Sequence, residues 1–173
     1  SLDEILVQGP HGLMLVPSAS GIGTMANLTP AEHAGLIRAF STYDRPLDVL
    51  IVDTAAGVQD SVTSFCRAVQ HVFVVVCDEP ASLTDAYALI KVLHQEHGIR
   101  RFRVICNMLS SQESGRKLMQ KLTAVCCQYL PDVVLDAAAG IPMDENLRRA
   151  VVRREPVVSL FPGSPAGRAF TEL

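Results

Sequence analysis

Three residues at the ends of short apolar runs have the side chains best placed for chemistry. Asp53 follows the run at residues 47–52 (LDVLIV), small residues then lead to Gly57, and Asn107 follows the run at residues 102–106 (FRVIC). A carboxylate at a strand end can hold the water shell of Mg²⁺, a glycine lets the backbone approach a ligand, and an amide can pair with a base edge. Each polar residue also has a local alternative, because Asp53 can cap the next helix and Asn107 can stabilise its own turn.

Five apolar runs rich in Val and Ile would position these residues. The runs alternate with longer segments of helical spacing, which is typical of a parallel sheet covered by helices on both faces. We therefore predict the α/β class, a mostly parallel and doubly wound sheet, and a single domain over residues 1–173. Ligands bind such sheets outside the carboxyl ends of the strands. The runs, each expected to be buried on both faces, are residues 13–16, 47–52, 72–77, 102–106 and 133–138.

Side chains that can cap backbone N–H groups mark the expected helix starts. A Ser or Thr followed three residues later by an acidic residue is typical of a capping box, and proline is common at the first helical position. The expected starts are Thr29 with Glu32, Ser82 with Asp85, Ser110 with Glu113, and Ser164 with Pro165.

Composition excludes several classes of protein. With 49% hydrophobic and 19% charged residues over 173 positions, the chain has enough apolar surface to fold. The net charge of −3 gives no electrostatic footprint for DNA or RNA, so we expect no direct nucleic-acid partner. The first residues lack the basic and apolar pattern of a signal peptide, which favours a cytoplasmic location. Five cysteines without a Cys-x-x-Cys pair favour buried thiols over disulfides or zinc.

Four phrases spread along the chain resemble the MinD/ParA-type ATPases of the deviant P-loop class, and most closely their flagellar-number regulators of the FleN or FlhG type. The resemblance implies an ATP-dependent switch that dimerises when it binds ATP and Mg²⁺ and docks reversibly on the membrane. It also implies restraint of flagellar gene expression through a transcription activator of the FleQ type. The phrases are residues 28–37 (LTPAEHAGLI), 52–57 (VDTAAG), 76–91 (VCDEPASLTDAYALIK) and 140–145 (GIPMDE).

The resemblance also implies roles for single residues. Asp53 corresponds to the aspartate that holds the magnesium-bound water and orders the switch, and Gly57 to the glycine whose backbone follows the γ-phosphate. Asn107 resembles the asparagine that reads adenine. The loop expected to close over the base from the other side contains Pro142, Met143 and Asp144.

The sequence departs from this family in one feature, the glycine-rich loop with two lysines that cradles the phosphates. The lysines here, Lys91, Lys117 and Lys121, all fall in expected helices, and residues 21–24 (GIGT) indicate a turn. We therefore expect a sheet without the family's central P-loop strand and a chain that alone neither binds ATP tightly nor hydrolyses it. Whether the chain is an enzyme stays open, and the alternative is a non-catalytic interaction module that has lost the nucleotide.

Two features near the end of the sequence concern membranes and partners. The residues up to Leu173 include no basic, apolar tail of the kind that forms a membrane-binding amphipathic helix, so we expect no membrane docking by this chain alone. Peripheral attachment to the membrane would then belong to the full-length form. A cluster of arginines is compatible with a solvated helix face or with a contact to lipid or a partner. Its members are Arg148, Arg149, Arg153 and Arg154.

Overall fold

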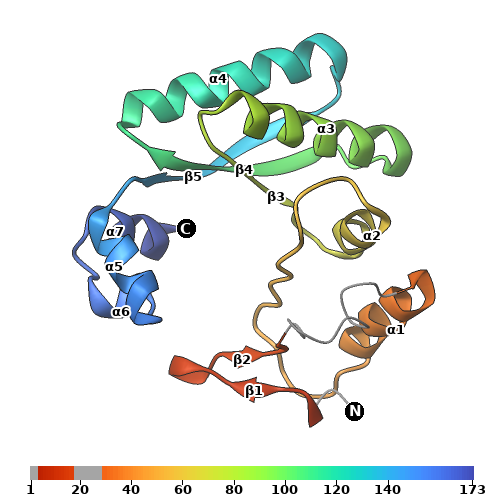
Figure 1. The fold of residues 1–173 in the computed structure, drawn as a ribbon. Helices are drawn as coiled ribbons and strands as arrows, with labels where there is room; N and C mark the ends of the chain where they lie inside the picture. Colours follow the sequence, from red (N-terminus) through yellow and green to blue (C-terminus); the bar gives the residue numbers. More distant parts are fainter. Residues whose placement is uncertain (1–3, 18–28) are drawn as a thin grey trace. The chain divides into compact units, whose positions relative to one another are not determined.

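The computed structural model of the protein describes residues 4–17 and 29–173 (Figure 1). The chain divides into two compact units, Ser1–Ala68 and Val69–Leu173, and each is described by itself. That both units belong to one domain stays a prediction. The turn expected at residues 21–24 lies outside the described residues.

The second unit is built on a parallel sheet of three strands in the order β3-β4-β5. The predicted α/β class is thus confirmed, and the three runs expected as strands at residues 72–77, 102–106 and 133–138 all contribute to it. The strands are β3 (Phe73–Val76), β4 (Arg101–Leu109) and β5 (Val134–Pro142), and the helices that connect them are α3 (Pro80–His97) and α4 (Gln112–Tyr129).

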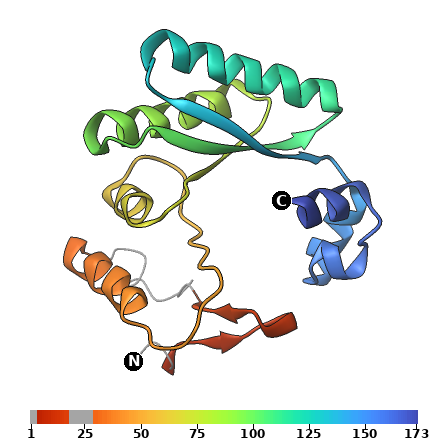
Figure 2. The ribbon, with the colours of Figure 1, turned by 180° about the vertical axis from the view of Figure 1, so that it is seen from behind.

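Both connecting helices pack on the same face of the sheet, as Figure 1 and Figure 2 show from opposite sides. The strands follow one another in sequence across the sheet without a reversal, and right-handed crossovers then place their helices on one side. On the other side, Phe73 and Val75 of β3 are exposed, Phe73 by 43%. The expectation that every run is buried on both faces is therefore wrong for β3.

The core of this unit lies between the sheet and its two helices. Alternate residues of β3 and β4 point toward the helices and are buried, as the side-chain period of two residues requires. They pack with apolar residues that recur every three or four positions along α3 and α4. The core residues are Val74, Val76, Phe102, Val104 and Cys106 of the strands and Ile90, Leu93, Leu118, Leu122 and Cys126 of the helices.

The first unit contains the two other runs expected as buried strands, and there the expectation is wrong. Residues 14 and 15 form β2 (Met14–Leu15), which pairs antiparallel with β1 (Val7–Gln8) across a short 3-10 turn, η2 (Pro10–Gly12), and its side chains are exposed. Residues 47–52 form no strand, and Ile51 is 84% exposed. A strand needs a hydrogen-bonded neighbour, and the described residues of this unit provide none for that run.

The helices of the first unit are α1 (Pro30–Ser41) and α2 (Asp60–Ala68). The predicted capping box of α1 is confirmed: Thr29 Oγ1 accepts from the Glu32 N–H at 3.3 Å, and Glu32 Oε2 accepts from the Thr29 N–H at 2.7 Å. The two helices pack through His33, which is buried and meets the ring of Phe65 edge-on at 5.6 Å between centroids.

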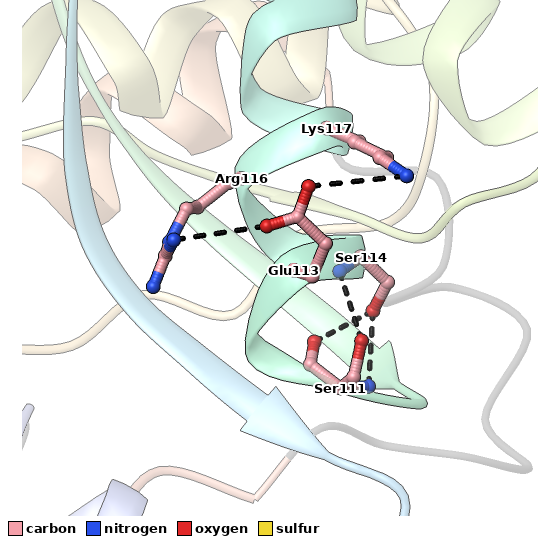
Figure 3. A network of polar contacts seen from close by, with 5 residues as sticks. All are labelled: Ser111, Glu113, Ser114, Arg116 and Lys117. Carbon is pink, nitrogen blue, oxygen red and sulfur yellow. Dashed lines mark hydrogen bonds and ion pairs between the residues drawn. The ribbon is translucent and has the colours of Figure 1, made fainter.

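The helix starts of the second unit agree only in part with the sequence analysis. Helix α3 begins at Pro80, before the expected Ser82, because Ser82 Oγ instead accepts from the Cys77 N–H at the end of β3. The cap of α4 is Ser111, one position after the expected Ser110, and it forms its reciprocal pair with Ser114 (Figure 3).

Three short helices follow β5, and a last expected start is confirmed there. They are α5 (Glu145–Arg153), α6 (Val157–Leu160) and α7 (Pro165–Glu172). Ser164 Oγ accepts from the Gly167 N–H at 3.0 Å, and Pro165 is the first helical residue of α7. In the part of the chain that the structure describes, no helix is both long and apolar enough to cross a membrane.

Candidate functional site

The carboxyl end of β4 contains a bulge built around Asn107. Asn107 Oδ1 accepts from the N–H of Met108 at 2.9 Å, and Met108 has a left-handed backbone with φ of 55°. The register with β5 shifts between Cys106 and Leu109 as a result. The local alternative for Asn107 is therefore realised, because its side chain stabilises a backbone conformation that residues other than glycine seldom adopt.

The ends of β4 and β5 lie side by side. Leu109 pairs with Pro142, and the Met143 N–H donates to the Leu109 carbonyl at 2.8 Å. Asn107 and the loop after β5 therefore share one edge of the sheet. Met108 and Met143 both expose more than half of their surface at this edge, and thioethers make favourable contacts with aromatic rings. This edge therefore carries the Asn107 amide and two exposed thioether side chains.

Asp144 anchors the loop after β5 with its carboxylate. Oδ1 accepts from the Asn146 N–H at 2.8 Å, which caps α5, and Oδ2 accepts from the Ala166 N–H at 2.9 Å in the first turn of α7. The Ala166 hydrogen bond is the largest of the causes that lower the pKa of this carboxyl from its ordinary value of 3.8. The structure shows Asp144 as a residue that holds the loop in place.

We expect Asp144→Ala to lower the free energy of unfolding by about 1–2 kcal/mol, because it removes a helix cap and leaves the Ala166 N–H without its acceptor. Urea denaturation at pH 7 measures the loss. The folded pKa is lowered, so the carboxylate contributes fully above its unfolded pKa and the contribution disappears as pH falls through the folded pKa. The variant and the wild type should therefore converge in stability in strong acid. A constant difference across the titration would contradict the assignment.

Asp53 and Gly57 lie in the first unit, in a segment without regular structure. Both are exposed, and Gly57 has φ of 112°, a backbone region open essentially to glycine alone. Helix α2 begins at Asp60, and the Gln59 carbonyl accepts its first helical hydrogen bonds. The cap position of that helix is thus Gln59, and the local alternative for Asp53 is wrong.

The predicted site residues divide between the two units. Asp53 and Gly57 lie in the first, and Asn107 and the loop of Pro142, Met143 and Asp144 lie in the second. Two lysines that could otherwise contact phosphates are already in ion pairs, Lys117 with Glu113 at 3.8 Å and Lys121 with Asp78 at 2.7 Å. Within the described ranges no lysine lies in a glycine-rich loop. These ranges also hold no group of three His, Cys, Asp or Glu side chains that could bind a metal ion.

A hollow of about 170 Å³ lies between α3 and α4, away from the residues predicted for the nucleotide. Apolar side chains form most of its wall. The lining residues are Leu83, Thr84, Tyr87, Lys121, Leu122 and Val125. This hollow is therefore not a pre-formed pocket for the base at the edge with Asn107 and Met143.

Known proteins resemble this chain over nearly its whole length. No family model matches the sequence. The antiactivator FleN of Pseudomonas aeruginosa is 53% identical over 169 residues, which are 98% of this chain and 60% of that protein. The resemblance to MinD/ParA-type proteins, and to flagellar-number regulators of the FleN type in particular, is confirmed. The flagellum site-determining protein YlxH of Helicobacter pylori is 27% identical over 99% of this chain and 58% of its own length.

A solved structure supports the fold. The septum site-determining protein MinD of Pyrococcus horikoshii, in complex with Mg-ADP, superimposes with a TM-score of 0.76 at 19% identity, over 99% of this chain and 66% of that one. The chain spans about 60% of the length of the FleN and YlxH relatives and has a MinD-like fold.

The sequence analysis did not indicate Met108, for which the only local signal is a preceding asparagine at a strand end.

Proposed function

We propose that this chain is part of an ATP-dependent switch that regulates flagellar synthesis and number. The observation that carries the proposal is the 53% identity to an antiactivator along 98% of the chain. An antiactivator acts on an activator, so the proposed partner is a flagellar transcription activator of the FleQ type. The switch would work in the cytoplasm as an ATP-bound homodimer without direct contact to nucleic acid.

In the proposed switch, the residues of this chain bind the base and follow the state of the phosphates. Asn107 would read adenine while the loop of Pro142, Met143 and Asp144 covers the base. Asp53 would hold the magnesium-bound water, and the backbone of Gly57 would lie along the γ-phosphate. Mg²⁺ supplies charge neutralisation for the phosphates when the nucleotide is bound. The shared sheet edge of Asn107 and Met143 supports the first role, and the positive φ of Gly57 supports the last.

Among the described residues no lysine lies in a glycine-rich loop that could cradle the phosphates, so the chain alone should neither bind ATP tightly nor hydrolyse it. A second candidate function is a non-catalytic interaction module. The hydrogen bonds already made by Asn107 and Asp144 favour this candidate, because a ligand would have to compete with the adjacent backbone for both side chains.

Titration of a fluorescent ATP analogue with Mg²⁺ separates the two functions. We expect no saturable binding by the chain alone and saturable binding after a peptide or domain that carries a lysine-containing glycine loop is added. Asn107→Ala should weaken the restored binding about tenfold, since it removes an amide that pairs with the base. Gln120→Ala, which removes an exposed amide from α4, is the matched control.

The outcomes are distinct. Restored binding that Asn107→Ala weakens supports the switch. Absence of binding under both conditions favours the interaction module. Tight binding by the chain alone, or magnesium-dependent ATP turnover by it, would overturn the proposal that the phosphate cradle lies elsewhere.

A further inference from the structure

Helix α5 carries a dense basic cluster in a chain whose net charge is −3. The four arginines expected as a cluster from the sequence stand on α5 and at its C-cap, and all are exposed. Glu145 and Glu155 flank the cluster. Among the residues that the structure describes, none of the four arginines makes an ion pair.

Some exposed basic side chains of the same unit are paired with acidic ones, whereas Lys91, Arg100, Arg103 and Arg168 are exposed and make no ion pair within the described residues. Arg101 meets Asp136 at 3.2 Å, and on α4 Glu113 lies between Arg116 and Lys117, as Figure 3 shows. On α5, the guanidinium of Arg149 lies 5.4 Å from the centroid of the Phe161 ring, a contact that orients the side chain and leaves its charge unpaired. With four unpaired arginines within residues 148–154, α5 and its C-cap nevertheless carry the densest group of unpaired cations among the described residues of this unit.

Two valines stand among these arginines. Val152 is 82% exposed and Val151 is also largely exposed, whereas Ala150 is buried and marks the inner side of the helix. Helical spacing places Val152 next to Arg148 and Arg149 on the outer face. A solvated helix face gains nothing from β-branched apolar residues, which form helices less well than polar straight-chain residues. An apolar centre with an arginine rim is the composition of a protein interface.

We propose that this face of α5 docks an acidic segment of a partner protein. The α5 basic face consists of Arg148, Arg149, Val151, Val152 and Arg153. The partner segment places carboxylates against the arginines and an apolar side chain against the two valines. This inference does not depend on ATP binding, and it adds a place of contact to the proposed regulatory role.

Charge and shape favour a protein over the other polyanions. An interfacial membrane helix needs a wide apolar face toward the lipid, but the inner side of α5 packs on its own unit through Ala150. A nucleic acid would use the arginines and leave the valines in water, because its phosphate backbone offers no apolar group to them. Only an acidic protein surface uses both components of the face.

The test is fluorescence anisotropy with a labelled synthetic helix that carries leucines on one face and glutamates beside them. A glutamine-for-glutamate peptide is the control ligand. The double variant Arg148→Glu with Arg153→Glu should weaken binding at least about tenfold, and Val152→Ser about threefold, because the first reverses the rim and the second removes the apolar centre. The matched control is Arg116→Glu with Lys117→Glu on α4, which changes the same number of charges. Far-UV circular dichroism verifies that each variant folds.

Parallel titrations with anionic phosphatidylglycerol vesicles and with duplex DNA distinguish the other classes of partner. The proposal is supported if the acidic peptide binds, the α5 variants weaken it and the α4 control does not. It is overturned if the wild type does not bind the acidic peptide, if both double variants have equal effects, or if vesicles or DNA bind through α5 more tightly than the peptide.

Discussion

Replacement of Phe102 by alanine is expected to lower the free energy of unfolding by about 3–5 kcal/mol, a large part of the stability of a typical domain. Phe102 is fully buried in the central strand β4, on the face that α3 and α4 cover. The ring is in contact with a close-packed layer, and its removal leaves a cavity that can collapse only partly. The helices above it are tied to strands at both ends, so they are not free to fill the space.

Phe73→Ala is the matched control for this prediction. Phe73 lies on the neighbouring strand β3, points to the opposite face of the sheet and is 43% exposed. Its loss should cost about 1 kcal/mol or less, mainly through the contact with Arg103, whose guanidinium lies 5.6 Å from the ring centroid. Urea denaturation followed by far-UV circular dichroism measures both changes. Similar losses for the two variants would contradict the one-sided core.

Much of the second unit could be predicted from the sequence because local signals determine it. The runs at residues 72–77 and 102–106 are continuous and rich in valine, and the apolar spacing along α3 is helical, so element types follow from short stretches of sequence. The strand order depends on contacts between distant residues. Contacts between distant residues also decide the outcome at residues 47–52, where the pattern predicts a buried strand but the structure shows mostly exposed side chains. A strand must pair with a neighbour, and the run itself does not specify one.

The candidate site could be predicted in position but not in detail. Asn107 and Met143 share a sheet edge because parallel strands end together, which spacing alone indicates. The side-chain partners are a different matter. The hydrogen bond that Asn107 accepts from the Met108 N–H depends on the bulge, and the contact of Asp144 with Ala166 joins residues 22 positions apart. Neither contact leaves a periodic pattern in the sequence.

Gly167→Ala is expected to destabilise the second unit by about 1–3 kcal/mol and to disturb the loop that holds Asp144. A Cβ at Gly167 would overlap the Phe161 carbonyl oxygen and lie 3.0 Å from that of Pro162. Both are backbone atoms, so the turn between α6 and α7 must move. The movement would strain two caps at the start of α7, because Ser164 accepts from the Gly167 N–H and Asp144 accepts from the adjacent Ala166 N–H.

Gly163→Ala separates this clash from a general effect of losing a glycine. A Cβ at Gly163 would meet no atom within 4 Å, and the residue lies in the same turn. That variant should be neutral or stabilise slightly, since alanine restricts the unfolded chain more than glycine does. Amide hydrogen exchange should show faster opening of α5 and α7 in Gly167→Ala only, because Asp144 couples the starts of these helices. If exchange accelerated in α7 and left α5 unchanged, Asp144 would not transmit the strain, and the loop beside Asn107 would be held by the strand pairing of β5 alone.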